Sequence, residues 1–165
     1  MIDRRECLLA LAASLLAAAG GAAQPARAPS AWPVPAPQLR ALTPEQLSKL
    51  IKASDGEHGI DATVSAEVAT ALKVTEKNET VPMRQLALAE GPRIHAVNRF
   101  AGDVAFLFGM VMDGEARVFR VEKDFRLAGA VSKKENQPPV RIDPAQAQTE
   151  AQREIDFWAS IADRL

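Results

Sequence analysis

The chain has 165 residues, and its 20 Lys and Arg against 21 Asp and Glu give a formal net charge of -1. This length predicts one domain with at most one appendage, and the balanced charge argues against a general nucleic-acid binder. Cys7 is the single cysteine, which excludes a disulfide framework and a set of cysteine metal ligands.

The first 23 residues, Met1–Ala23, have the pattern of a secretory signal peptide. Arg4 and Arg5 supply a positive start, and Cys7–Ala19 is an apolar run too short to serve as a mature membrane anchor. Small residues follow, so cleavage is expected to leave Gln24 at the new terminus. We therefore expect a periplasmic or secreted protein with no stable membrane anchor. The arginine pair also resembles part of a twin-arginine signal, which leaves that export route open.

Residues 24–40 form a proline-rich linker between the signal peptide and a single α+β domain predicted for residues 41–165. The spacing of its prolines favours extended polyproline II conformations. These prolines are Pro25, Pro29, Pro33, Pro35 and Pro37. Trp32 stands alone among them. The composition favours a spacer over a docking peptide.

Two short helices are predicted at the start of the domain. Thr43 is a suitable N-cap, Pro44 fits the first helical position, and Gln46 can close a capping box. Gly56 should end this helix. A second helix is expected near Ser65–Lys73, where apolar side chains fall on one stripe.

The strongest short-range signal is a β-hairpin between Val104 and Val121. Two apolar runs meet there at Asp113-Gly114, a dipeptide that suits a two-residue turn with positive φ. Such a turn places Phe108 opposite Phe119. Short connections on both sides extend the hairpin to an antiparallel meander of about five strands over residues 83–131.

Because side chains alternate along a strand, the predicted register sorts the meander into two faces. The large apolar face, which is the expected core, carries Leu86, Leu88, Ile94, Phe100, Val104, Phe106, Phe108, Met110, Met112, Phe119, Val121, Phe125, Leu127 and Val131. The small basic face carries Ala87, Ala89, Arg93, His95, Val97, Arg99, Ala105, Leu107, Gly109, Ala116, Val118, Arg120, Arg126, Ala128 and Ala130.

A long C-terminal helix is predicted from Pro144 to about Leu165, with Asp143 as its N-cap and Gln146 closing a second capping box. One stripe of this helix is apolar and needs an apolar partner, which the phenylalanine-rich face of the meander can provide. The stripe consists of Ala147, Ala151, Ile155, Trp158, Ala162 and Leu165. Trp158 is therefore interpreted as a core residue.

No motif in the chain supports enzyme chemistry. Asp55–Asp61 crowds three carboxylates and His58 together, but an EF-hand would need a glycine where Ile60 stands and a glutamate where Ala66 stands. With two histidines in all, a zinc site is not expected. Nucleophile-elbow and phosphate-binding glycine motifs are absent. We predict no catalytic residues, no metal site and no cofactor, and leave enzymatic activity undecided.

The residues singled out for binding are His95, Arg99, Arg120 and Arg126 on the small basic face. The predicted register sets Arg120 directly opposite Arg126, with Arg99 at the same end and His95 further along, across from Gly109. Like charges directly opposite repel each other. An anionic group is therefore expected beside them, for which an acidic protein partner is one source. A solvated sheet face is the simpler interpretation.

The sequence predicts an exported binding or interaction protein. The alternative is a carrier of an apolar or amphipathic anionic small ligand. The order of two helices, a meander and a long C-terminal helix resembles that of helix-grip proteins, which hold apolar ligands between sheet and helix. That resemblance implies a ligand site between the sheet and the C-terminal helix, and no particular function follows from the fold itself.

Overall fold

A computed structural model describes residues 31–100 and 105–165, and it confirms an α+β fold with an antiparallel sheet and a C-terminal helix. The sheet has seven strands in chain order: β1 (Ile60–Val64), β2 (Val81–Glu90), β3 (Arg93–Phe100), β4 (Ala105–Met112), β5 (Glu115–Glu122), β6 (Leu127–Lys134) and β7 (Val140–Arg141). The helices of the described residues are α2 (Pro44–Asp55), α3 (Ala66–Ala71) and α4 (Pro144–Ala162). The expected signal peptide, with Cys7, lies outside these residues.

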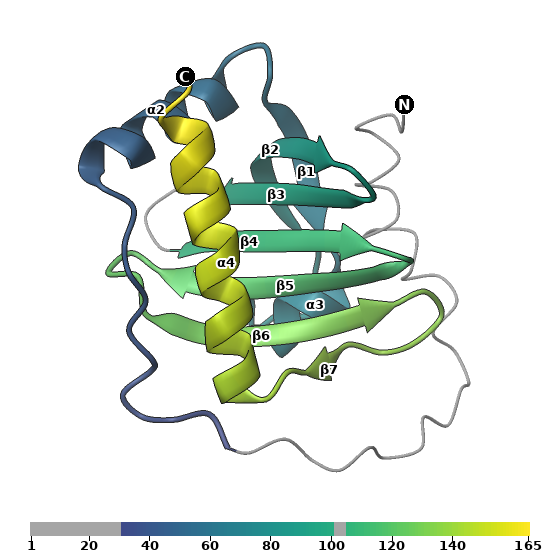
Figure 1. Cartoon of the computed structure of the whole chain (residues 1–165). Coiled ribbons are helices and arrows are strands. Elements are labelled where there is room, and N and C mark those ends of the chain that lie inside the picture. The colour runs from purple at the N-terminus through teal and green to yellow at the C-terminus, as the bar shows by residue number, and fades with distance from the viewer. Residues whose placement is uncertain (1–30, 101–104) are drawn as a thin grey trace.

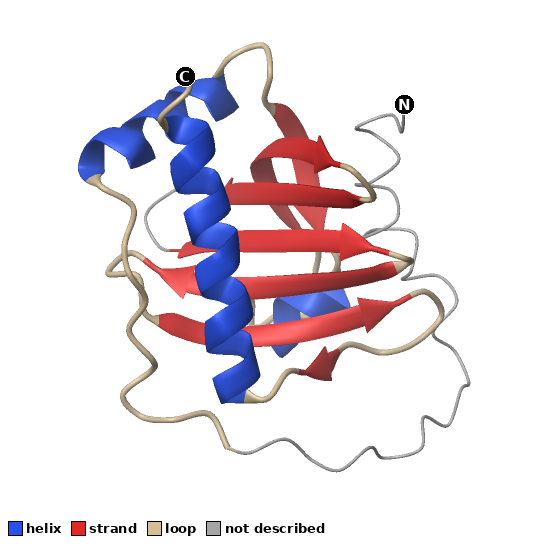
Figure 2. Ribbon diagram, in the orientation of Figure 1, coloured by secondary structure: helices blue, strands red, loops and turns tan. Residues whose placement is uncertain are grey.

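The sheet separates two layers (Figures 1 and 2). Helix α4 runs across the strands on one side, here named the α4 face, and α3 lies behind the sheet on the other side, the α3 face. Helix α2 lies near the end of α4. Among the described residues, no helix has both the length and the apolar character needed to cross a membrane.

The predicted capping contacts of α2 and α4 are confirmed with one exception, and α4 ends at Ala162, before the predicted Leu165. The side chains and backbone amides of Thr43 and Gln46 exchange both hydrogen bonds of the capping box, and Gly56 caps the end of α2. The Asp143 carboxylate accepts a hydrogen bond from the first turn of α4. Gln146 does not reach back as predicted, because its amide donates to Glu150 one turn later.

The register of the central hairpin is confirmed, with Phe108 paired with Phe119 and Met112 paired with Glu115. The expected count of about five strands was too low. Ile60–Val64, predicted to belong to the connection between the two helices, forms β1 and pairs with β2, and Val140–Arg141 pairs with β6 as β7. Both missed strands are short edge strands, whose few residues carry little periodic signal.

Strand β3 is turned over relative to its predicted orientation. Glu90 pairs with Arg93, so the β2–β3 loop has two residues, one fewer than expected. On the other side His95 pairs with Met110, and Gly109 pairs with Ala96. Each slip of one residue reverses the faces. The two slips cancel for β2, whereas β3 has its side chains on the opposite face from the one predicted.

A second correction concerns the connection between β5 and β6. Glu122 N–H bonds to the Arg126 carbonyl, so the loop is centred one residue later than expected, with Phe125 in the left-handed region at φ 61°. The register then shifts, because Arg120 pairs with Gly129 whereas Val121 pairs with Leu127. The predicted pairing of Arg120 with Arg126 is wrong. The extra residue of this β-bulge also exchanges the predicted faces of the strand beyond it.

The main core lies between the α4 face and the helices, as the apolar stripe predicted. Phe108 and Trp158 are both fully buried there. The predicted stripe residues are all buried except Leu165, which lies beyond the end of the helix and is 56% exposed. From the sheet this core takes Leu86, Val97, Phe108, Phe119, Val121, Leu127 and Ala130.

Residues 31–40 lie along this core and do not behave as a free spacer. The Trp32 indole N–H donates to the Leu127 carbonyl at 2.9 Å, and Gln38 forms a β-bridge with Arg126. Leu39 is buried in the main core. This part of the predicted linker is therefore a strap held against β6 and α4, and Trp32, predicted to stand alone, packs against the domain.

Candidate functional site

The structure does not bring the four predicted binding residues together. Because β3 is turned over, His95 and Arg99 lie on the α4 face, whereas Arg120 reaches α3 on the other side of the sheet. Arg126 lies at the start of β6, beside the strap. The predicted basic face is therefore divided among three places in the molecule.

Each of the three arginines is held by groups of its own chain. Arg120 donates to the Leu72 and Lys73 carbonyls at 2.9 and 2.8 Å, which are the backbone acceptors that the end of α3 leaves free. Its second terminal nitrogen pairs with Glu122 at 2.8 Å. A cation at a helix C-terminus also interacts favourably with the helix dipole. Arg120 thus has a structural role that sequence reasoning missed.

The other two arginines bind neighbouring segments. Arg99 pairs with Asp55 at the end of α2. Arg126 donates to the Ala36 carbonyl of the strap at 2.9 Å and pairs with Asp124. The binding of an acidic partner by these arginines stays a prediction, and it no longer has the paired geometry that motivated it.

His95 belongs to a buried polar contact beneath α4. It is 4% exposed, its Nδ1 lies 2.8 Å from Glu154 of α4, and its ring stacks on Phe157 at a centroid distance of 3.8 Å. Its Nε2 lies 3.4 Å from Glu90. Burial raises the pKa of the Glu154 carboxyl, while the hydrogen bond with His95 acts in the opposite direction. Glu154 was not predicted as an inward-facing residue.

A second charged contact joins the sheet to α4. Arg117 donates to both carboxylate oxygens of Glu150 at 2.6 Å, and it also pairs with Glu115. The hydroxyl of Ser132 donates to Glu115, and this bond is the main cause of the lowered pKa of Glu115. These contacts join α4 to the sheet, and they pair the charged side chains of the α4 face.

The carboxylates of the Asp55–Asp61 segment do not converge. Asp61 pairs with Arg84, whereas Asp55 pairs with Arg99, and His58 is exposed. Within the described part of the chain, no group of three or more His, Cys, Asp or Glu side chains is arranged to hold a metal ion.

The α3 face carries a second, smaller core. Helix α3 and β1 pack their apolar side chains on this face, which was predicted to be the small basic one. The buried members are Ala62, Val64, Val68, Ala69, Leu72, Met83, Leu107, Val118 and Val131. A Cβ on Gly129 would lie 3.3 Å from the Leu72 side chain, which indicates how closely α3 approaches β6.

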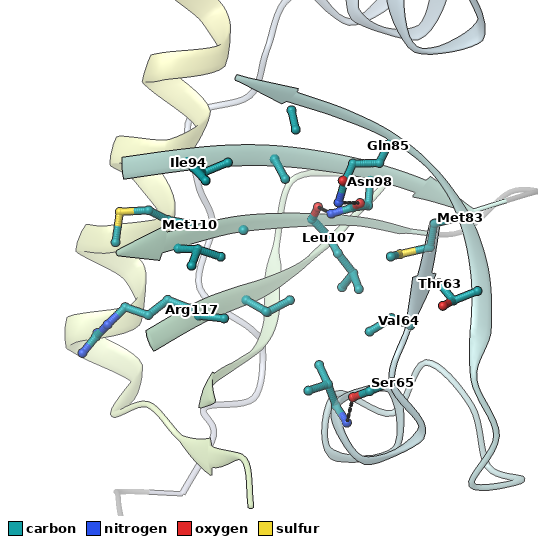
Figure 3. A pocket seen from close by; sticks show the side chains of 17 residues that line it. Thr63, Val64, Ser65, Met83, Gln85, Ile94, Asn98, Leu107, Met110 and Arg117 are labelled. Carbon is teal, nitrogen blue, oxygen red and sulfur yellow. Dashed lines mark hydrogen bonds between the residues drawn. The ribbon is translucent and has the colours of Figure 1, made fainter. Parts of the chain in front are cut away.

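Beside this second core lies a groove, here named the α3-side groove (Figure 3). Its walls come from β1 and the start of α3 on one side and from β2 to β5 on the other. Its volume is about 570 Å³ when the space open to solvent is counted. The space that the centre of a water molecule can occupy is only about 20 Å³. Side chains and backbone of Thr63, Val64, Ser65, Val68, Met83, Gln85, Ala87, Ile94, Ala96, Asn98, Leu107, Gly109, Met110, Val111, Ala116, Arg117 and Val118 line it.

A row of small residues hollows the floor of the groove. Ala87, Ala96 and Gly109 are cross-strand neighbours on β2, β3 and β4, followed by Val118 on β5. A Cβ placed on Gly109 would meet its nearest neighbour, the Arg117 carbonyl, at 3.6 Å, so there is room for a side chain there. Because the side chains of this row are small, space remains between the row and the opposite wall formed by β1 and α3.

Among the polar residues that line this groove, Gln85 and Asn98 carry carboxamides. Gln85 and Asn98 are cross-strand partners, 2% and 4% exposed, and the Gln85 amide donates to the Asn98 oxygen at 2.6 Å. Figure 3 shows them beside Leu107, whose carbonyl accepts from the Asn98 amide at 3.0 Å. Met110 and Arg117 border the groove but extend away from it towards α4.

The space between the sheet and α4, where the alternative prediction set a ligand, is filled by the main core. Phe108, Phe119 and Trp158 are at most 1% exposed there. The groove lies on the opposite face. Sequence reasoning missed it because β3 was turned over, although the alanines of the small face were its visible signal.

Comparisons of the chain with protein-family models, with curated proteins and with solved structures found no match.

Proposed function

We propose that this chain is an exported binding protein that takes a small apolar ligand in the α3-side groove. The expectation of export rests on the sequence of the first 23 residues. The observation that carries the ligand is the cross-strand row of Ala87, Ala96 and Gly109. A concave, mostly apolar site with a few polar groups is the usual form of a small-molecule site.

The dimensions of the groove favour a slender ligand. In this structure the groove has room for only about one or two water molecules, well below the roughly 300–1,000 Å³ of typical ligand sites, so a ligand must widen it. An alkyl chain fits such a shape better than a fused ring system does. A ligand would lie along the groove, spread the short helix α3 slightly from the sheet, and keep one side towards solvent.

The experiment is a titration of the mature chain with octan-1-ol, followed by two-dimensional NMR of the backbone amides. We expect saturable shifts at Ala87, Ala96 and Gly109. Ala87→Leu fills the groove and should abolish these shifts. Ala89→Leu is the matched control, because Ala89 lies two residues further along the same face of β2 and is exposed.

Equal binding by both variants would contradict the proposed site, because the ligand would then lie elsewhere. Absence of saturable shifts in the wild-type chain would contradict the proposed function.

A further inference from the structure

The groove has two buried carboxamides where a sheet face normally carries apolar side chains. Gln85 lies between Met83 and Ala87 on the α3 face of β2, and Asn98 faces it from β3. Burying an amide costs free energy unless its hydrogen bonds are replaced. Two amides at neighbouring positions in a groove therefore call for an explanation beyond packing.

The hydrogen bonds of the pair are incomplete within the described part of the chain. A carboxamide offers one oxygen acceptor and two N–H donors. Gln85 Nε2 donates to Asn98 Oδ1, and Asn98 Nδ2 donates to the Leu107 carbonyl. Neither of these bonds uses Gln85 Oε1, and no other described residue donates to it. This oxygen keeps a small accessible surface, and Gln85 is one of the residues that line the groove.

Three basic side chains near the groove bind groups outside it. Arg120 binds the carbonyls at the end of α3, and Lys133 donates to the carbonyls of Lys134 and Gln137. The Arg117 guanidinium binds Glu150 and Glu115 on the α4 face. An anionic head group in the groove would meet apolar side chains, neutral amides and the neutral hydroxyls of Thr63 and Ser65, and an unpaired charge in such surroundings is costly.

We infer that the ligand of the α3-side groove is a neutral molecule with a slender apolar body and one hydrogen-bond-donating head group, a hydroxyl or an amide, which donates to Gln85 Oε1. This inference rests on the proposed function and specifies its ligand class. Of the apolar and the amphipathic anionic ligands predicted from the sequence, it selects the neutral kind.

The test compares three probes by NMR titration of the mature chain: octan-1-ol, its isomer 1-methoxyheptane, which lacks a donor, and octanoate. Octan-1-ol should bind more tightly than the ether by about three- to tenfold, the effect of one neutral hydrogen bond. Octanoate should bind more weakly than octan-1-ol. The isomers have the same number of heavy atoms, so their difference reports the donor.

Two variants assign the preference to the amides. Gln85→Met keeps the length of the side chain and should bring octan-1-ol to the affinity of the ether. The double variant Gln85→Met/Asn98→Leu removes both amides, so that neither is left without its partner. If the single variant folds poorly, the double variant tests whether the amides cause the preference for octan-1-ol. Gln148→Leu is the control, because Gln148 lies exposed on α4.

The outcomes separate this inference from the proposed function. Equal binding of ether and alcohol by the wild-type chain would make the amides structural and overturn the inference while leaving the groove as a ligand site. Tighter binding of octanoate would overturn it in favour of an anionic ligand. If none of the three probes shifts the groove residues, the proposed function fails, and the inference fails with it.

Discussion

The two faces of the sheet differ in the size of their side chains and in the length of the helix that covers each face. The α4 face packs Phe108 and Phe119 against a long helix and buries charged groups such as Glu154 at its margin. The α3 face packs smaller residues against a helix of six residues, and it buries Lys133 as well as the neutral amides of Gln85 and Asn98. A long amphipathic helix can cover a whole face, whereas a helix as short as α3 leaves part of it hollow. The difference explains why the groove lies on the α3 face.

The largest expected loss in the free energy of unfolding comes from truncating large side chains of the main core, and Leu107, next to Phe108 but on the α3 face, provides the comparison. Phe108→Ala should destabilise the fold by about 3–5 kcal/mol, as should Trp158→Ala, because both side chains are fully buried in the main core. Leu107→Ala should cost about 2–3 kcal/mol, near the low end for leucine, because it borders a groove that solvent and neighbours can fill. Denaturant unfolding of the three variants measures the difference.

The ranking of these variants decides which face is the principal core. A larger loss for Leu107→Ala than for Phe108→Ala would contradict the comparison, since it would make the α3 face the better packed of the two.

The main core was predictable because its signals are local. Asp113-Gly114 fixes the hairpin register, and the helix stripe with Trp158 requires a large apolar face. The assignment of β3 failed because it depended on loop lengths, and an error of one residue reverses a strand. The β-bulge opposite Arg120 has no recognisable sequence pattern, so it could not be predicted.

The candidate site was less predictable for the same reason. Arg120 and Arg126 were placed together by an assumed register, and the bulge and the later loop separate them. The row of Ala87, Ala96 and Gly109 becomes visible only when three strands are aligned correctly. Partners distant in sequence, such as Glu154 for His95, follow from the docking of α4 and not from any local pattern.

An intermediate effect is expected at the arginine that joins the α3 face to its helix. Arg120→Ala removes two hydrogen bonds to carbonyls at the end of α3, and we expect a loss of about 1–3 kcal/mol in the free energy of unfolding. Arg126→Ala should cost under about 1 kcal/mol, because this side chain is more exposed and its acidic partner lies in solvent. Urea unfolding of both variants makes the comparison.

If Arg120→Ala were as stable as the wild-type chain, the hydrogen bonds from this arginine to the end of α3 would contribute nothing to the free energy of unfolding. A greater loss for Arg126→Ala than for Arg120→Ala would instead make the strap, and not α3, the more important attachment.

The smallest effect concerns the protonation of two carboxyl groups, Glu154 and Glu115, at the α4 face. Burial raises the folded-state pKa of Glu154 above its ordinary value of 4.5. The folded chain therefore keeps this proton at pH values where the unfolded chain has released it. The contribution of this carboxyl to stability is fully present below the ordinary pKa and is lost as the pH rises through the folded-state pKa. Glu154→Gln has no proton to lose, so its stability relative to wild type should increase as the pH rises.

Glu115 supplies the opposite case on the same face of the sheet. The hydrogen bond from Ser132, together with Arg117, lowers its folded-state pKa below 4.5. Its contribution is present above the ordinary value and is lost as the pH falls, so Glu115→Gln should lose stability relative to wild type as the pH rises. Urea unfolding of both variants between about pH 2 and pH 8 should give differences of opposite slope, for Glu115 below its ordinary pKa and for Glu154 above it. Because the groove holds neutral amides, Gln85→Met should change stability equally at every pH. A pH-dependent difference for Gln85→Met would mean that a titrating group faces the groove, and the neutral character assigned to the groove would then be wrong.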